Sequence, residues 1–327
     1  MSAAACWPED VTTELDLLEA NLRSDLAGAP GTLGEIARSA LAAGGKRMRP
    51  RLVFAAAGAC GGDAATAVSC RPFAIAVEYL HTATLLHDDL VDGASLRRGE
   101  PPAYQKWGPK EAVLAGDLLL ARCLSLVVED GMQGAASVLA RATERMAIGE
   151  ALEVELARRT DVGEDDYYLF AAAKTAALFT AAAELGAIAA GAPEVFRKKL
   201  GRFGEHLGTA FQVVDDVLDL VAPSEESGKE AGIDVRAGVP TLPALKALAL
   251  LGAEERTLLE RVLRGDTRAE TDRARAVELV RTHGVAPAAE AARALLARAR
   301  GELDGFERGP YIALLEDMTH ALERKLP

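Results

Sequence analysis

An all-α fold is predicted for this chain of 327 residues by three features of its sequence. Hydrophobic residues make up 50% of the chain while aromatic residues make up only 5%, and alanine is abundant. Runs of Val, Ile and Thr of the kind that form strands are nearly absent, which argues against a sheet. Apolar residues recur at helical spacing with few helix breakers, most clearly from Ala64 to Val91, where Pro72 is the only proline.

The helices are placed by the prolines and acids that suit a first turn and by the glycines that stop a helix. No convincing linker interrupts the series, so we expect one domain over residues 1–327, which is at the upper end of what one core supports. The segment 223–238 suits a mobile loop. The expected helices span 8–26, a short segment after Gly31, 64–91, 109–131, 135–159, a segment after 165–166, 208–221, 240–251, 254–263, 268–283, 287–303 and 310–326.

Charge and cysteine content limit the partners and the compartment. The net charge of −12 argues against nucleic acid as a general partner of the surface. The four cysteines show no CxxC spacing and suggest reduced thiols in a cytoplasmic protein. The N-terminus lacks a basic region followed by an apolar core, so no secretory signal is expected. The most membrane-like run, 178–192, is broken by Glu184 and is too short to span a bilayer, so we expect no transmembrane segment.

A first cluster of acids lies at the end of the long helix, in LHTATLLHDDLVDGASLRRG from Leu80 to Gly99. Because the helix stops at Gly93, the acids occupy its last turn, where backbone carbonyls already carry negative partial charge. A cation is therefore expected nearby, and Asp89 points to the flank. Residues that fall within roughly 40° of one line along the helix axis are Val77, His81, Thr84, Asp88 and Asp92.

A second cluster repeats the spacing, with Asp215, Asp216 and Asp219 embedded in Val, Leu and Phe. Isolated carboxylates in such surroundings are costly unless they are neutralised. Two facing acid clusters suit Mg²⁺, which prefers carboxylate oxygens and shared phosphate oxygens. A single copy of this motif is as readily a solvated helix end, but two copies in apolar helices argue against that alternative.

Cations are concentrated at a few positions. The run GGKRMRPR carries Lys46 and Arg49 three residues apart, so one helical turn brings both to a single anion, with arginine offering a bidentate fork. A solvated basic loop is the alternative for this run on its own. Lys174 is either a surface lysine or a ligand for an anion, depending on whether its face meets the acid helices. Lys229 is the cation that the loop 223–238 could place over a bound anion.

These motifs together resemble the trans-isoprenyl diphosphate synthases, also called polyprenyl synthetases, and the resemblance covers nearly the whole chain. Their order and their spacing both agree with that family, which makes the match specific. The matching segments are GGKRMRP at 44–50, HTATLLHDDLVDGASLRRG at 81–99, GD at 116–117, KTAALF at 174–179, AFQVVDDVLD at 210–219, and GKEAGID followed by PTLP.

The resemblance implies one all-α domain around a deep central cavity, a homodimer, and typically three Mg²⁺ ions that hold an allylic diphosphate. It implies Asp88, Asp92 and Asp215 as direct ligands, with Asp89, Asp216 and Asp219 completing the shell. The starter would be dimethylallyl, geranyl, farnesyl or geranylgeranyl diphosphate. The implied substrate-binding residues are Lys46, Arg49, His81 and Arg98 for isopentenyl diphosphate, Arg97, Lys174 and Lys229 for the allylic diphosphate, and Thr175, Phe211 and Gln212 beside the reacting groups.

The implied reaction breaks an allylic carbon–oxygen bond, adds the double bond of isopentenyl diphosphate to the resulting cation and then loses a proton. Mg²⁺ and fixed cations stabilise the departing diphosphate, so no protein nucleophile is needed. Two positions depart from the family pattern. Val239 stands where a lysine is common before the PTLP segment, and Glu153 stands where a glutamine is common, so both changes should tune diphosphate binding.

Product length should depend on what blocks the cavity below the first acid cluster. Short-chain members of the family place bulky aromatics where this chain has Ala83 and Thr84. Leu80 and Val77 come next, about 12 to 16 Å down the helix axis from Asp88, and Val127 and Leu139 are possible floor residues from neighbouring helices. Because none of these side chains is very large, we expect a product of twenty carbons or more.

Two other functions are compatible with this architecture. A terpene cyclase would ionise a prenyl diphosphate without adding an isopentenyl unit, but the complete GGKRMRP run and the second acid cluster speak against it. A non-catalytic subunit of a heteromeric synthase should have lost acids or basic anchors, and this chain retains them.

Overall fold

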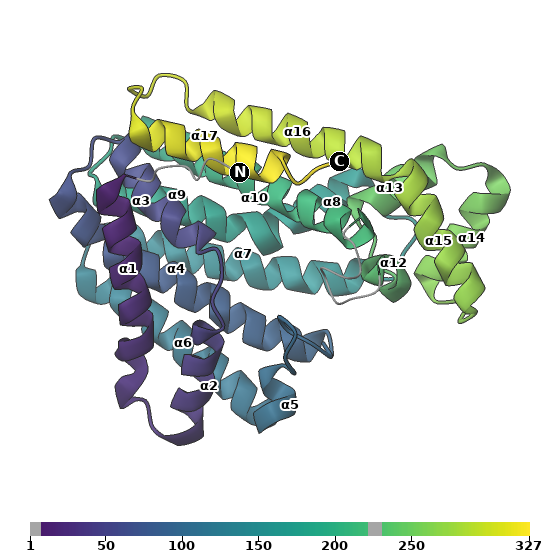
Figure 1. Ribbon diagram of the computed structural model, residues 1–327, viewed down its shortest axis with the longest axis horizontal. Helices are drawn as coiled ribbons and strands as arrows, with labels where there is room; N and C mark the ends of the chain where they lie inside the picture. The colour runs from purple at the N-terminus through teal and green to yellow at the C-terminus, as the bar shows by residue number, and fades with distance from the viewer. Residues whose placement is uncertain (1–7, 222–230) are drawn as a thin grey trace. The chain divides into compact units, whose positions relative to one another are not determined.

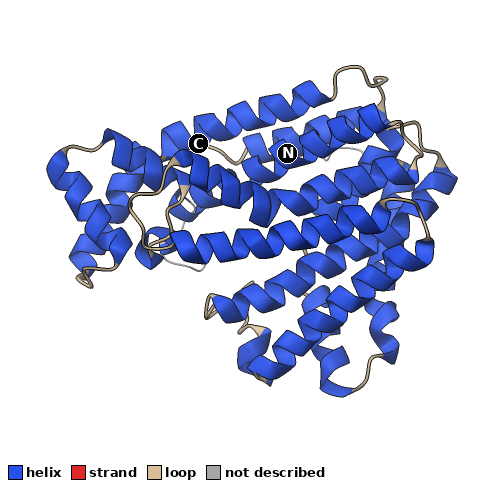
Figure 2. Ribbon diagram, turned by 180° about the vertical axis from the view of Figure 1, so that it is seen from behind, coloured by secondary structure: helices blue, strands red, loops and turns tan. Residues whose placement is uncertain are grey.

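The computed structural model describes residues 8–221 and 231–327. Within these residues the backbone forms helices and no strand (Figure 2), which confirms the predicted all-α class. The described residues fall into two compact units. Unit 1 comprises the described part of Met1–Thr143 with Leu178–Gly201 and Gly305–Leu315, and unit 2 comprises Glu144–Ala177, Arg202–Asp304 and Glu316–Pro327.

Most of the expected helices agree with the structure to within a few residues, but α10 begins at Glu194, well before the expected segment 208–221. Figure 1 labels the α-helices along the chain. The N-terminal half contains α1 (Glu9–Ser24), the 3₁₀ helix η1 (Asp25–Gly28), α2 (Gly31–Ala42), α3 (Met48–Ala59), α4 (Ala64–Val91), α5 (Ala103–Trp107), α6 (Pro109–Asp130) and α7 (Ala135–Leu156). The remainder contains α8 (Glu164–Ala171), the π-helix η2 (Ala172–Ala176), α9 (Ala177–Ala189), α10 (Glu194–Val221), α12 (Ile233–Ala237), α13 (Leu242–Leu250), α14 (Ala253–Arg264), α15 (Glu270–His283), α16 (Val285–Glu302) and α17 (Pro310–Glu323).

Several short elements were not expected from the sequence. The sequence predicts no helix at α3, because its buried apolar residues from Leu52 to Ala57 are consecutive and show no helical period. Helices α5 and α12 lie in segments predicted as loops, and each is only five residues long. Within the helix expected after 165–166, the turn Ala172–Ala176 is π-helical rather than α-helical.

Unit 1 is built on α4, which packs against α1, α3 and α6. Asp63 caps its start by accepting a hydrogen bond of 2.9 Å from the backbone N–H of Thr66. Every residue from Phe73 to Leu80 is buried, so this part of α4 is enclosed on all sides. The polar residues at its end, from His81 to Asp92, follow directly on this buried section.

Arg47 is a structural residue of unit 1 rather than a surface cation. It lies just before α3 in the left-handed region, with φ 47° and ψ 41°. Its guanidinium is paired with Glu19 and Glu78 and donates to the carbonyl of Leu41 at 2.9 Å. The side chains of Arg47 and Glu78 are each 6% exposed, so the pair is buried. This buried pairing fixes the chain between the cations Lys46 and Arg49.

Replacing Arg47 with Ala is expected to lower the free energy of unfolding by about 3 kcal/mol, because the carboxylate of Glu78 would stay buried without its partner. Urea unfolding followed by circular dichroism measures this loss. The neighbouring Lys46→Ala variant is the control, because Lys46 is exposed and its loss should change stability by less than about 0.5 kcal/mol. Equal stability of the two variants would contradict the assigned role of Arg47.

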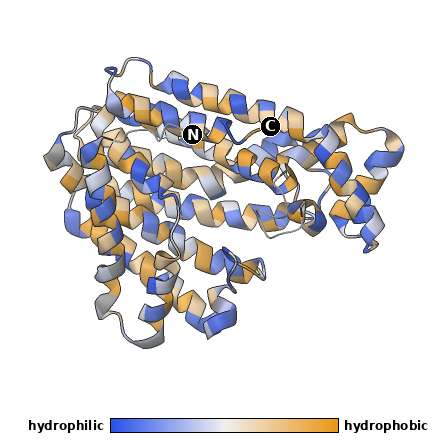
Figure 3. Cartoon of the chain, in the orientation of Figure 1, coloured by the Kyte–Doolittle hydropathy of each residue, from blue (hydrophilic) through white to orange (hydrophobic). Residues whose placement is uncertain are grey.

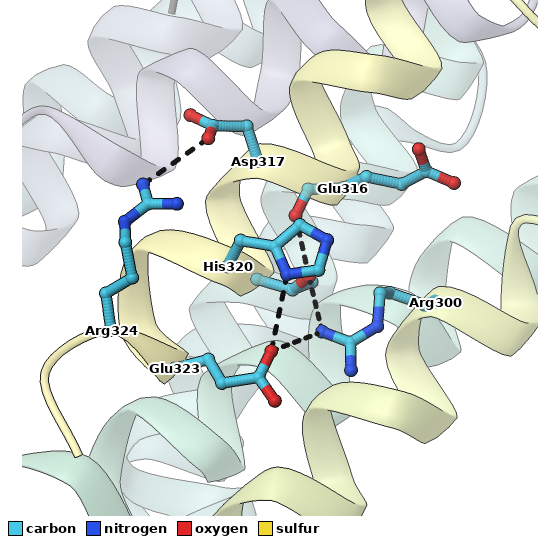
Figure 4. A network of polar contacts seen from close by, with 7 residues as sticks. Arg300, Glu316, Asp317, His320, Glu323 and Arg324 are labelled. Atoms are coloured by element: carbon cyan, nitrogen blue, oxygen red, sulfur yellow. Dashed lines mark hydrogen bonds and ion pairs between the residues drawn. The ribbon is translucent and has the colours of Figure 1, made fainter. Parts of the chain in front are cut away.

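In unit 2, α13 packs against α8, α15 and α16, and α14 lies beside α15 (Figure 1). Apolar and polar residues alternate along α16 (Figure 3), as expected for a helix with one buried face. Figure 4 shows Arg300 of α16 directed at Glu323 of α17, where the donor–acceptor distance is 3.1 Å. His320 contacts the same carboxylate at 3.3 Å, so a polar network joins the C-terminal part of α17 to α16.

One stretch, Glu164–Ala189, is long and apolar enough to cross a membrane by length and composition, with a mean hydropathy of 1.2. The most apolar window of this stretch is 67% buried inside the protein. The core helix of a water-soluble protein passes the same test, so this stretch is weak evidence for a membrane span.

Candidate active site

A cluster of cations in unit 1 surrounds His81. Burial and the charges of Arg49, Arg98, Arg97 and Arg47 lower the pKa of His81 well below its usual value, so its imidazole is neutral at pH 7. The sequence pattern had indicated that His81 and Asp88 share one helix face, but it had not indicated this cationic surrounding. Four arginines acting on one imidazole form a region that favours an anion.

Arg49 is the strongest anion-binding candidate in this cluster. Its guanidinium carbon lies 4.6 Å from the centroid of the Phe179 ring, within the range of a cation–π contact. Burial lowers the pKa of Arg49 to about 10, so the group remains charged at pH 7. Its Nε atom is buried and has no hydrogen-bond partner in the protein. A buried donor without a partner is costly, and an anionic ligand would satisfy it.

Arg98 connects this cluster to the glycine turn that carries Lys46. It adopts a left-handed backbone conformation with φ 53°, and its guanidinium donates to the carbonyl of Gly44. Lys46 is exposed on the same turn. The structure therefore links Arg49, His81 and Arg98 electrostatically, and it places Lys46 on the turn that Arg98 contacts.

In the first acid motif the three aspartates differ in environment. Asp89 is buried and accepts a hydrogen bond of 2.7 Å from Nε of Arg97, whose Nη2 lies 2.5 Å from the same oxygen. Arg97 is thus the cation expected at the end of this helix. Asp88 is half-buried and Asp92 is exposed, so both are more accessible to a ligand than Asp89.

The second acid motif belongs to unit 2 and is organised by a chain of hydrogen bonds. Thr175 Oγ1 donates to Gln212 Oε1 at 2.7 Å, and Gln212 Nε2 donates to Asp216 at 2.9 Å. Tyr167 donates its hydroxyl to the other oxygen of Asp216 at 2.6 Å. These contacts hold Asp216 in a buried position, whereas Asp215 is exposed.

Asp219 and Asp234 complete this acidic region. Asp219 accepts backbone hydrogen bonds from Ile233 at 3.2 Å and Asp234 at 3.3 Å, which fixes the start of α12 beside α10. Burial and the neighbouring charges of Asp219, Asp215 and Glu153 raise the pKa of Asp234 to about 7. Asp234 belongs to the GKEAGID segment, but its sequence gave no sign of this crowding.

The residues present fit a hydrated divalent cation rather than a preformed protein cage. Among residues 8–221 and 231–327, no three His, Cys, Asp or Glu side chains gather closely enough to hold a metal ion. Mg²⁺ usually keeps water and substrate phosphate among its ligands and takes only one or two carboxylates. The crowding that raises the pKa of Asp234 is a negative environment that a cation would relieve.

Other predicted site residues are placed as follows. Phe211 is half-buried, and Lys325 Nζ lies 6.0 Å from its ring centroid. Val239 donates its backbone N–H to the carbonyl of Asp234 at 2.9 Å. Lys229 lies outside the described residues.

The residues predicted to limit chain length differ in accessibility. Val77, Leu80 and Ala83 on α4 are at most 2% exposed, and Val127 of α6 is 1% exposed. Thr84 is half-buried and donates its hydroxyl to the carbonyl of His81 at 2.9 Å. Thr84 is therefore the first of these side chains that a ligand can reach.

Comparison with known proteins gives one consistent family. Residues 30–280 match the family described as polyprenyl synthetase. The chain is 40% identical over 226 residues to an all-trans-nonaprenyl-diphosphate synthase (geranyl-diphosphate specific) of Rhodobacter capsulatus, covering 69% of each chain.

Two solved structures are similar over nearly the whole chain. A decaprenyl diphosphate synthase from Rhodobacter capsulatus has a TM-score of 0.87 and 36% identity, covering 98% of this chain and 97% of that one. A polyprenyl synthase from Caulobacter crescentus CB15, complexed with calcium and isoprenyl diphosphate, has a TM-score of 0.86 and 37% identity, covering 97% and 95%.

Proposed function

Because this chain belongs to the polyprenyl synthetase family and is a prenyltransferase, we propose that it condenses isopentenyl diphosphate with an allylic diphosphate to give products of twenty carbons or more. The observation that carries the proposal is the half-buried Arg49, whose buried Nε has no hydrogen-bond partner and whose charge acts on a neutral His81. This arrangement suits the diphosphate of isopentenyl diphosphate. The allylic starter would be dimethylallyl, geranyl, farnesyl or geranylgeranyl diphosphate.

In the proposed reaction the allylic carbon–oxygen bond breaks and its electron pair leaves with diphosphate. Arg97 and Lys174 bind the departing group and stabilise its negative charge. Arg49 and Arg98 hold isopentenyl diphosphate so that its double bond attacks the allylic cation. Loss of one proton to diphosphate then gives the elongated product.

The family typically uses a divalent metal, and the Caulobacter protein is complexed with calcium. We assign Asp88, Asp92 and Asp215 as ligands of three Mg²⁺ ions per site, with Asp89, Asp216 and Asp219 in the surrounding shell. Magnesium, when bound, would neutralise charge on the diphosphate. Because Asp89 and Asp216 already accept hydrogen bonds from Arg97 and Tyr167, they are better suited to orient neighbouring groups than to bind metal directly.

Incubation of the full chain with labelled isopentenyl diphosphate, farnesyl diphosphate and Mg²⁺ tests the proposal. Label in a longer prenyl diphosphate supports it, and chelation with EDTA should stop the reaction. Release of a hydrocarbon without label would identify a terpene cyclase instead. No turnover of either substrate would indicate a subunit that needs a partner.

We also propose that the two units act as one functional domain in a cytoplasmic homodimer. The support for a dimer is an apolar arc on α6, where Val113, Leu114, Leu124 and Val128 are 36%, 56%, 39% and 64% exposed. These positions span about 100° of the helix surface at the usual helical rotation. Exposed apolar surface of this kind marks a protein contact, and light scattering of the purified chain measures the oligomeric state.

Replacing Thr84 with Phe is expected to shorten the product, because the added ring would fill space next to buried Leu80 and Ala83. The measurement is mass analysis of the prenyl diphosphates formed from farnesyl diphosphate. Thr84→Ser is the control, since it keeps the hydroxyl that donates to His81 and adds no volume. An unchanged product distribution for Thr84→Phe would exclude Thr84 as a wall.

A further inference from the structure

Lys174 is held by two glutamates of α7 in unit 2. Its Nζ lies 2.9 Å from Glu150 Oε2 and also forms an ion pair with Glu153 Oε2. The side chains of Lys174, Glu150 and Glu153 are 22%, 20% and 22% exposed, so the three groups are largely shielded from water. One ammonium therefore faces two carboxylates in a setting where charge interactions are strong.

Local geometry explains why these groups meet. Glu150 and Glu153 are three residues apart on α7 and therefore lie on the same face. Lys174 lies in the π-helical turn Ala172–Ala176, which meets that face. At Gly149 a Cβ atom would lie 2.2 Å from the backbone nitrogen of Lys174, so only glycine permits this approach. The backbone thus fixes the distance between the lysine and the glutamates.

Two carboxylates share the one ammonium of Lys174. Burial alone would lower the pKa of Lys174, but the charges and hydrogen bonds of Glu153 and Glu150 outweigh it and raise that pKa, so the ammonium stays protonated. A second anion that approaches Lys174 must compete with a carboxylate already bound to it. Replacing one carboxylate by a neutral amide would remove the competition and leave the other to keep the ammonium charged.

We infer that Glu153 limits the affinity of the protein for the allylic diphosphate by competing with that diphosphate for the ammonium of Lys174. The inference rests on the proposed function, in which Lys174 binds this substrate. When the diphosphate binds, Lys174 exchanges its contact with Glu153 for a phosphate oxygen while Glu150 keeps its contact. The elongated product carries the diphosphate that came with isopentenyl diphosphate, and this group must take the allylic position at Lys174 before the next addition. Glu153 would compete with it there, favour product release and thereby shorten the chain at which release occurs.

Steady-state kinetics of Glu153→Gln tests this role. The KM for the allylic diphosphate should fall by about tenfold, equivalent to about 1.4 kcal/mol, while the KM for isopentenyl diphosphate stays unchanged. The product distribution should shift to longer chains. Glu153→Asp keeps the charge and should restore most of the wild-type KM. Glu155→Gln, at an exposed position of the same helix, is the matched control and should behave as wild type.

An unchanged or higher allylic KM for Glu153→Gln would overturn the inference, because the carboxylate would then be neutral to binding or would assist it. Lys174→Met separates this failure from failure of the proposed function. If Lys174→Met leaves the allylic KM unchanged, the assignment of Lys174 to that diphosphate is wrong. If it raises the allylic KM while Glu153→Gln has no effect, only the competing role of Glu153 is wrong.

Discussion

Asp88→Asn is expected to lower kcat/KM for elongation by about 10³-fold, because a neutral amide cannot hold a divalent cation against the departing diphosphate. Asp88 is half-buried at the end of α4, and its neighbour Asp89 accepts a hydrogen bond from Arg97. The amide has nearly the same size as the carboxyl, so packing should be preserved. Incorporation of labelled isopentenyl diphosphate over a range of Mg²⁺ concentrations measures the loss.

Asp16→Asn is the matched control for this variant. Asp16 is exposed on α1 in the same unit, and the same chemical change there should leave kcat/KM as in wild type. Circular dichroism should show that both variants remain folded. If Asp88→Asn retained activity within tenfold of wild type across the Mg²⁺ range, Asp88 could not be a direct metal ligand.

Arg49→Met is expected to raise the KM for isopentenyl diphosphate by about 10²-fold, since charged hydrogen bonds of about 1.5 to 3 kcal/mol each would be lost. The same variant should be as stable as wild type or more stable. Its Nε is buried and has no hydrogen-bond partner, and replacing such a group by an apolar one of similar length removes a desolvation cost. Kinetics and urea unfolding of one preparation measure both effects.

The result that distinguishes this prediction is a higher KM for isopentenyl diphosphate together with unchanged or higher stability. Arg51→Met is the control, because Arg51 lies two residues along α3 and is not among the arginines named as the main charges that lower the pKa of His81. It should leave the KM for isopentenyl diphosphate unchanged. A large loss of stability in Arg49→Met, together with an unaltered KM, would show that Arg49 supports the fold rather than the substrate.

The long-range spacing of the motifs was readable from the sequence, whereas the pairing of charges was not. Helix α4 runs from Ala64 to Val91 as predicted because its apolar period and its glycine stop are local signals. Arg47 lies among similar basic residues, yet it alone is buried against Glu19 and Glu78. Its partners are distant in sequence, so no local pattern distinguishes it from Lys46 or Arg49.

Lys174 is a second residue whose charge partners could not be predicted from the local sequence. Its sequence setting left two alternatives, a surface lysine or an anion ligand, and the structure places it between Glu150 and Glu153. The close approach depends on Gly149, whose missing side chain becomes meaningful only when the neighbouring backbone is known. The different environments of Asp215 and Asp216 likewise arise from Tyr167, a residue 49 positions away from Asp216.

In the π-helical turn Ala172–Ala176, the number of residues is more tightly constrained than their identity. Tyr167 before the turn and Thr175 within it both connect to α10, through Asp216 and Gln212. Deleting one residue from the turn would rotate everything on one side by about 100° relative to the other and separate these two connections. Small apolar substitutions at the alanines of this turn should be accepted during evolution, whereas insertions and deletions should be eliminated, so gaps in an alignment belong outside the turn.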